Sequence, residues 1–266
     1  MKKSFNLRAR FFALVVFATI AFVFAWTYAI APFKETTNMV IMNGATTLAA
    51  LTAALILTRV TLFFQRDEMP FMIWLAFAVC MWLWTIAEAY WGYLYTTVGE
   101  VPVFSAADVL WFIGYLTLTI SLVRQYRLVF FNQTYAIRWA AIGLWFVILV
   151  IIETILLVTK SQSPLGDFFR YFYVFTDSAI GLAALYLVVA FRGRALAIPW
   201  LTISSFVVTD ILYLRLTSTG AYDWVMSGVS VALLADTLYV VAYLIVAWGV
   251  FEQYLLLRQS SDPSPT

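Results

Sequence analysis

The sequence predicts an all-α integral membrane protein of about eight transmembrane helices, arranged as two parallel four-helix repeats with both termini in the cytoplasm. Two observations predict this class. Hydrophobic residues make up 64% of the chain and charged residues only 11%, whereas a soluble domain carries roughly a quarter charged residues. In addition, most of the chain consists of long runs free of Lys and Arg, each close to the ~20 apolar residues that a bilayer-spanning helix needs.

Eight apolar runs, the seventh of which contains Arg215, are expected to be helical, because irregular backbone in hydrocarbon leaves amide groups unpaired. They cover residues 11–33, 36–58, 69–98, 101–123, 139–159, 171–191, 197–219 and 224–251. The first run follows a basic segment and ends in Ala29-Ile30-Ala31, which is typical of a signal-peptide cleavage site. We expect this run to be retained, because it is long enough to span a bilayer and the repeat described below requires it.

The orientation follows from the Lys and Arg residues, which gather in cytoplasmic loops. If the N-terminus is inside, twelve of the sixteen lie on the inner side: Lys2, Lys3, Arg8, Arg10, Arg59, Arg66, Arg124, Arg127, Arg138, Arg192, Arg194 and Arg258. The outer side has Lys34, Lys160, Arg170 and Arg215. Residues 1–8 are then a cytoplasmic segment, and the polar, Pro-containing tail 256–266 is predicted to be a disordered cytoplasmic tail.

Residue types that are rare or missing exclude several kinds of chemistry. The chain has no histidine and a single cysteine, Cys80. Histidine-ligated haem, histidine-based zinc sites and a Ser-His-Asp triad are therefore excluded, as is an intrachain disulfide. No cofactor or metal is expected. No basic stretch is interleaved with polar recognition residues, so we expect a lipid bilayer and no nucleic acid among the partners.

Two segments of the chain resemble each other. Residues 107–111 (Ala-Asp-Val-Leu-Trp) match 235–239 (Ala-Asp-Thr-Leu-Tyr), and Tyr-Leu follows at the same spacing in both. In the preceding spans, Glu88 and Asp210 each have an aromatic residue three positions on and a glycine near the expected helix end, and Leu-Ala-Ala-Leu occurs at 48–51 and 182–185. Residues 9–128 and 136–255 are therefore interpreted as two repeats. An even number of spans in each makes the repeats parallel, although apolar helices also resemble one another by chance.

Six carboxylates lie within the predicted spans: Glu88, Asp108, Glu153, Asp177, Asp210 and Asp236. A charged side chain at the bilayer centre costs ~2.5–3.5 kcal/mol on insertion scales, so these acids need compensation or a shallow position. They come late in the outward spans and early in the inward spans, which places all six in the outer half of the membrane. Glu153 has no counterpart in the first span and is the weakest candidate.

Four of these acids are followed by an aromatic residue at the third position. The pairs are Glu88/Trp91, Asp108/Trp111, Asp210/Tyr213 and Asp236/Tyr239, and two of them extend by a further turn to Tyr115 and Tyr243. Such positions share one helix face, and carboxylates beside aromatic faces suit a cationic or amphipathic ligand. These residues and Asp177 are the predicted ligand-binding residues. The alternatives are an interfacial aromatic belt that includes Trp91 and Tyr95, ion pairs with Arg170 or Arg215, and a structural hydrogen-bond network.

Residues 104–115, Phe-Ser-Ala-Ala-Asp-Val-Leu-Trp-Phe-Ile-Gly-Tyr, resemble a recurring segment of the multi-span N-terminal membrane sensor domains of bacterial diguanylate cyclases and histidine kinases. That segment reads Pro-Ser-x-Ala-Asp-Leu-(aromatic)-x-Leu-x-x-Tyr. The second half of the chain also resembles these domains. It has an acid in the sixth span (Asp177), an acid ahead of a loop that ends in Gly-x-Tyr (Asp210 and 220–222), and a final Asp-x-x-(aromatic)-x-x-x-Tyr (Asp236, Tyr239 and Tyr243). The resemblance covers roughly 70–255 and implies a sensory module with a cytoplasmic or membrane signalling partner. Because no catalytic output domain follows Leu257, we expect a stand-alone relative or a truncated sensor.

A weaker resemblance is to lysoplasmalogenase-like eight-span membrane enzymes, which have carboxylates in the third and seventh spans. Glu88 and Asp210 are the matching positions. Those enzymes usually have Asp at the first position and a histidine in the fourth span, which this chain lacks. Enzymatic activity is therefore left open, and no catalytic residue is assigned. A proton-coupled transporter and an accessory subunit of a membrane complex are further alternatives.

Overall fold

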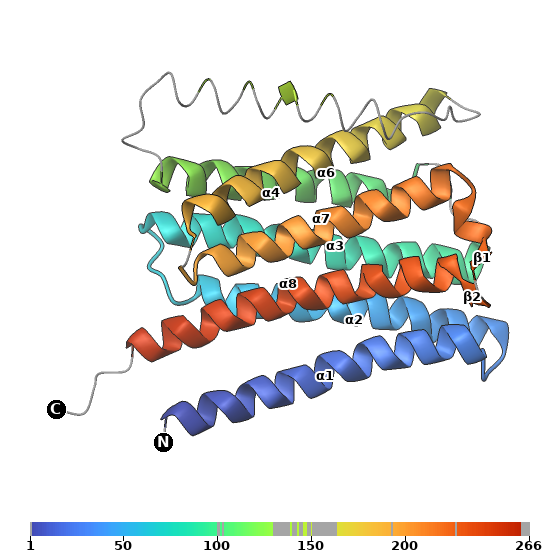
Figure 1. Ribbon diagram of the computed structural model, residues 1–266, viewed down its shortest axis with the longest axis horizontal. Helices are drawn as coiled ribbons and strands as arrows, with labels where there is room; N and C mark the ends of the chain where they lie inside the picture. Colours follow the sequence, from blue (N-terminus) through green and yellow to red (C-terminus); the bar gives the residue numbers. More distant parts are fainter. Residues whose placement is uncertain are drawn as a thin grey trace.

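A computed structural model describes residues 2–99, 104–129, 164–192, 194–226 and 228–261, together with the isolated residues 102, 139, 143, 146, 147 and 150. These residues form a bundle of long helices with roughly parallel axes (Figure 1). The helices are α1 (Lys2–Ile30), α2 (Glu35–Thr61), α3 (Met69–Val98), α4 (Ala106–Val129), α6 (Pro164–Ala190), α7 (Ala197–Ser218) and α8 (Val231–Ser261). A short 3-10 helix, η1 (Ala221–Asp223), and a hairpin of β1 (Val225–Met226) and β2 (Val229–Ser230) connect α7 to α8.

All seven of these long helices are apolar enough to cross a membrane. Their outward faces are apolar as well; Phe11, Phe12 and Phe22 of α1, for example, are each about two-thirds exposed. Exposed apolar side chains of this kind are favourable in contact with lipid but unfavourable in contact with water. The chain is therefore a polytopic membrane protein in contact with the bilayer. The predicted fifth span, 139–159 with Glu153, lies outside the described residues apart from the isolated positions within it.

Several helix ends differ from the sequence-based expectation. The predicted third span, 69–98, coincides with α3, but α4 begins at Ala106 instead of 101 and α6 at Pro164 instead of 171. The described residues 224–226 and 228–230, predicted to open the last span, instead end η1 and form the hairpin. Residues 256–261, expected to belong to a disordered tail, instead continue α8, and the partly buried Leu257 packs against the core.

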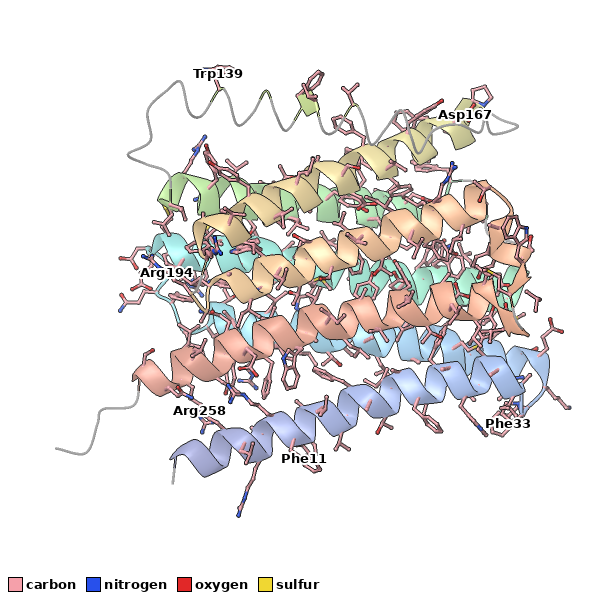
Figure 2. The ribbon with its side chains drawn as sticks, in the orientation of Figure 1. Phe11, Phe33, Trp139, Asp167, Arg194 and Arg258 are labelled. Atoms are coloured by element: carbon pink, nitrogen blue, oxygen red, sulfur yellow. The ribbon has the colours of Figure 1, made fainter. Side chains whose placement is uncertain are left out.

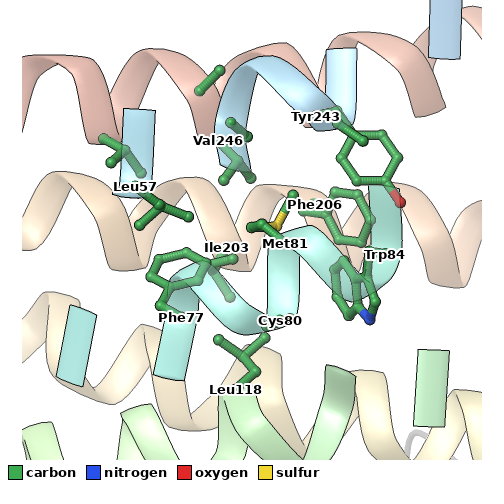
Figure 3. Packing of buried hydrophobic residues seen from close by; sticks show 14 of the residues in the cluster. Leu57, Phe77, Cys80, Met81, Trp84, Leu118, Ile203, Phe206, Tyr243 and Val246 are labelled. Carbon is green, nitrogen blue, oxygen red and sulfur yellow. The ribbon is translucent and has the colours of Figure 1, made fainter. Parts of the chain in front are cut away.

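Six helices form a closed ring, in which α2, α3, α4, α6, α7 and α8 each pack against the next, and α8 packs against α2. Helix α1 lies outside the ring against α2 and α8. Aromatic side chains fill the middle of the ring. Phe206 lies between Trp84 and Tyr243 (Figure 3), with its ring centroid 5.1 Å and 4.8 Å from theirs.

The start of α1 and the end of α8 lie at the same end of the bundle, where Arg194 and Arg258 also lie (Figures 1 and 2). Other arginines belong to the helix ends and loops at this end, which we call the basic end: Arg8, Arg10, Arg59, Arg66, Arg124, Arg127 and Arg192. Here Arg10 of α1 donates two hydrogen bonds, of 2.8 and 2.6 Å, to the carboxylate of Glu252 of α8. This ion pair attaches α1 to the ring.

Candidate functional site

A cavity of about 620 Å³ opens inside the ring, toward the end of the bundle opposite the basic end. Helices α1, α2, α3, α4, α6, α7 and α8 and the short helix η1 all contribute to its wall. Thirteen of its twenty described lining residues are aromatic: Phe24, Tyr28, Trp84, Trp91, Tyr95, Trp111, Tyr115, Tyr173, Phe206, Tyr213, Tyr222, Tyr239 and Tyr243. Three are acidic, namely Glu88, Asp210 and Asp236, and no Lys or Arg occurs among the lining residues that the structure describes.

The structure brings nine of the eleven sequence-predicted site residues to this cavity. These are Glu88, Trp91, Trp111, Tyr115, Asp210, Tyr213, Asp236, Tyr239 and Tyr243. They come from α3, α4, α7 and α8, so the stripes of acid and aromatic residues on four helices face a common space. The other two residues, Asp108 and Asp177, are not among those that line it, and both lie behind tyrosines that do.

Glu88 is the acid of α3 and is only 7% exposed. Its Oε1 accepts hydrogen bonds of 2.8 Å from the hydroxyls of Tyr239 and Tyr243, both on α8. The two tyrosines are one helical turn apart, so their hydroxyls reach the same oxygen from one face of α8. A buried carboxylate needs such donors, because its desolvation is otherwise uncompensated.

Asp210 of α7 and Asp177 of α6 share one tyrosine. The Tyr115 hydroxyl donates a hydrogen bond of 2.7 Å to Oδ1 of Asp177 and lies 3.4 Å from Oδ2 of Asp210. Asp177 is completely buried. Because α6 begins at Pro164, Asp177 is the middle residue of that helix, and the prediction that it comes early in its span is wrong.

Asp236 of α8 has a partner from outside the long helices. The Tyr222 hydroxyl, in η1, donates a hydrogen bond of 2.6 Å to Oδ2 of Asp236. Gly220 makes this contact possible, because its φ of 71° turns the chain sharply between α7 and η1. Burial raises the pKa of Tyr222 above its ordinary value, and the hydrogen bond to Asp236 raises it further, so this phenol stays protonated and remains a donor.

Asp108 stabilises the start of α4 instead of lining the cavity. Its Oδ2 accepts a hydrogen bond of 2.8 Å from the backbone amide of Ser105, and the Ser105 hydroxyl accepts one from the amide of Ala107. This reciprocal pattern is a capping box. The other oxygen of Asp108 accepts a hydrogen bond of 2.7 Å from the hydroxyl of Tyr173, which lines the cavity. Asp108 therefore positions one wall residue.

Sequence reasoning missed the contribution of the first two helices. Two residues of α1 and three of α2 complete the cavity wall: Phe24, Tyr28, Met42, Asn43 and Thr46. Aromatic residues without a neighbouring acid gave no signal on α1. A signal did exist on α2, because Asn43 stands five residues before one Leu-Ala-Ala-Leu segment and Asp177 five residues before the other. The two residues are equivalent in the predicted repeat.

The arrangement suits a cation better than an anion. Three carboxylates and many aromatic faces surround the space, and both attract positive charge. No group of three or more acidic or cysteine side chains with metal-binding geometry occurs among the described residues. The chain matches no family model, no curated protein and no solved structure.

Proposed function

We propose that this protein is a membrane sensory module that binds a small cationic or amphipathic molecule in the aromatic cavity and signals to a cytoplasmic or membrane partner. The observation that carries the proposal is the composition of the cavity wall. It holds three acids and thirteen aromatic residues with no basic residue among the described ones. Its volume of about 620 Å³ lies within the range of ordinary small-molecule sites.

We infer further that the chain has eight spans in two parallel repeats and that the basic end is cytoplasmic. Helix α4 ends at the basic end and α6 begins at the opposite end (Figure 1), which supports one further crossing between them. The positive-inside rule supports the orientation. With this orientation the cavity lies toward the outer face, where a ligand from outside the cell can reach it.

The ring of helices supports a signalling role, because ligand contacts come from both predicted repeats. A ligand that binds one packing of the repeats more tightly than another shifts the population toward that packing. The change would reach the basic end through α3, α7 and α8, which carry Glu88, Asp210 and Asp236. The similarity of residues 104–115 to bacterial sensor domains supports the same role.

Two matched probes test the binding proposal directly. Benzyltrimethylammonium carries a positive charge, and neopentylbenzene is its neutral carbon isostere of the same shape. We expect purified protein in mild detergent to bind the first and not the second, as measured by calorimetry and tryptophan fluorescence. Glu88→Gln and Asp236→Asn are each expected to weaken binding at least about tenfold, or ~1.4 kcal/mol.

The aromatic contribution has an internal control on α3. Trp91 lines the cavity, whereas Trp82 donates a hydrogen bond to Thr58 and is not among the lining residues. We expect Trp91→Leu to weaken binding of benzyltrimethylammonium and Trp82→Leu to leave it unchanged. Equal binding of the charged and neutral probes, or equal effects of the two tryptophan substitutions, would overturn the proposal.

A proton-coupled transporter is the second candidate, and the position of Asp177 favours it. A buried acid at the middle of α6, which shares the Tyr115 hydroxyl with Asp210, is typical of proton pathways. The test is uptake of radiolabelled benzyltrimethylammonium into proteoliposomes with an imposed pH gradient. Gradient-driven uptake that Asp177→Asn abolishes would favour transport, and binding without uptake would favour the sensor.

A further inference from the structure

The two oxygens of the Asp177 carboxyl differ in their surroundings. Its Oδ1 accepts the Tyr115 hydroxyl at 2.7 Å, but Oδ2 is buried without a hydrogen-bond donor among the residues that the structure describes. The residue is completely buried. An ionised carboxylate with a bare oxygen would lose its hydration without replacement, which is strongly unfavourable in an apolar interior.

The nearest candidate for a partner is a second acid. The Tyr115 hydroxyl lies 2.7 Å from Oδ1 of Asp177 and 3.4 Å from Oδ2 of Asp210, so the carboxyl groups of these two acids, on the neighbouring helices α6 and α7, lie close together. Two ionised carboxylates at this separation repel each other in a low-dielectric environment. A proton on Oδ2 of Asp177 removes both difficulties, since it cancels one charge and makes Asp177 a donor to Asp210.

The surroundings of the pair provide phenols and another acid. The described titratable groups that act on the two aspartates come from every packed helix: Glu88 of α3, Tyr115 of α4, Tyr173 of α6, Tyr213 of α7, and Tyr239 and Tyr243 of α8. None of these groups brings a positive charge. A proton is therefore the countercharge that the immediate surroundings allow.

We propose that Asp177, Asp210 and the Tyr115 hydroxyl form a proton-binding site, and that a cation binding in the cavity displaces this proton. Asp210 lines the cavity and Asp177 does not, so the cation approaches Asp210. The O–H bond at Asp177 breaks, the proton passes to Asp210 and from there to water in the cavity, and the cation then faces two carboxylates. One positive charge enters for each one that leaves. The exchange rests on the proposed function, whereas the proton site does not.

The predicted repeat supplies the variant that tests this idea. Asn43 stands in the first half where Asp177 stands in the second, so Asp177→Asn copies a residue that the fold already accommodates. The amide of asparagine donates to Asp210 as a protonated aspartic acid would, but it has no proton to release. The variant is therefore expected to fold and to bind the cation without releasing a proton.

Infrared spectroscopy of the purified protein tests the proton site without any ligand. We expect a carboxylic-acid C=O stretching band at neutral pH that shifts in D2O. Asp177→Asn and Asp210→Asn should each remove intensity from it, whereas Glu252→Gln, in the ion pair at the basic end, should not. Circular dichroism and gel filtration confirm folding of each variant. A band that both aspartate variants leave unchanged would overturn the proton site.

Calorimetry of benzyltrimethylammonium binding in two buffers of different ionisation enthalpy tests the exchange. Wild-type protein should release about one proton per bound cation and bind more tightly as the pH rises, whereas Asp177→Asn should release none. Binding without proton release would contradict the exchange and leave the proposed function standing. Absence of binding in every form would contradict the proposed function and the exchange with it, and the infrared band would still decide the proton site.

Discussion

The hydroxyl of Tyr243 on α8 donates a hydrogen bond of 2.8 Å to Glu88 on α3. Tyr115 on α4 has the corresponding relationship to Asp210 on α7, at 3.4 Å. The sequence pairs Tyr115 with Tyr243 and Glu88 with Asp210. The last helix of each predicted half therefore reaches the third helix of the other half, and the acid network joins the two halves at the cavity.

This relationship predicts unequal effects of removing the two hydroxyls. Tyr243→Phe keeps the ring on Phe206 and leaves Glu88 a donor in Tyr239, so we expect a small loss of stability, about 1 kcal/mol or less. Tyr115→Phe removes the one donor that the described residues provide to the buried Asp177 carboxyl, and the expected loss is larger, about 1–3 kcal/mol. Thermal unfolding in one detergent measures both.

A further single variant controls for the loss of a tyrosine hydroxyl as such. Tyr239→Phe also leaves Glu88 with one donor, because Tyr243 remains. It should behave like Tyr243→Phe. Equal destabilisation by all three substitutions would contradict the role assigned to Tyr115.

Hydropathy predicted most of the fold, because a span must be long and apolar whatever its neighbours are. It placed α3 to the residue. It failed where local chemistry sets the boundary. The Ser105–Asp108 capping box delays the start of α4, and Gly220 and Gly228, both with positive φ, make room for η1 and the hairpin before α8. Helix α8 also continues beyond its apolar run to Ser261, with the partly buried Leu257 packed against the core.

Helical periodicity predicted which residues of each helix share a face, but no more of the candidate site than that. An acid and the aromatic residues three and seven positions after it share one helix face. Nine of the residues predicted in this way line one cavity in the structure. Periodicity could not separate Asp108, whose third position in α4 makes it a cap, from acids that face the cavity. It also could not reveal which helices enclose the space, so the residues of α1 and α2 were missed.

Packing at the centre of the ring predicts a position where a single methyl group is not tolerated. A Cβ on Gly114 of α4 would overlap the indole of Trp84. That indole is held by Phe206, by Tyr115 and by a hydrogen bond of 3.3 Å to a backbone carbonyl of α4, so it has nowhere to move. We expect Gly114→Ala to lower the unfolding temperature clearly, through overpacking of about 1–3 kcal/mol.

The matched control is Gly44 of α2, where nothing lies within 4 Å of an added Cβ. Gly44→Ala should be neutral or stabilising by up to about 1 kcal/mol, because alanine is the better helix former. Both variants are compared by thermal unfolding. If Gly114→Ala were as stable as Gly44→Ala, the close approach of α3 and α4 at Trp84 would be wrong.

The ion pair between Arg10 and Glu252 predicts a defined attachment of α1 at the basic end. Two hydrogen bonds join the groups, but the Arg10 side chain is 42% exposed and that of Glu252 13%. Because solvent and salt screen such a pair, we expect Arg10→Glu to cost about 1 kcal/mol or less, plus the repulsion between the two acids. The measurement is hydrogen exchange of the first turns of α1, which should quicken.

Charge reversal decides whether the pair itself is responsible. The double variant Arg10→Glu/Glu252→Arg restores opposite charges at the same two positions, so it should return exchange in α1 close to the wild-type rate. Arg8→Glu is the control, since it removes a positive charge from the same exposed stretch of α1 and is not in the ion pair with Glu252. Quickened exchange that the double variant does not reverse, or that Arg8→Glu reproduces, would show that net charge and not this contact holds α1.

Because α1 supplies Phe24 and Tyr28 to the cavity, a loosened α1 should also weaken binding of benzyltrimethylammonium, and the double variant should restore it.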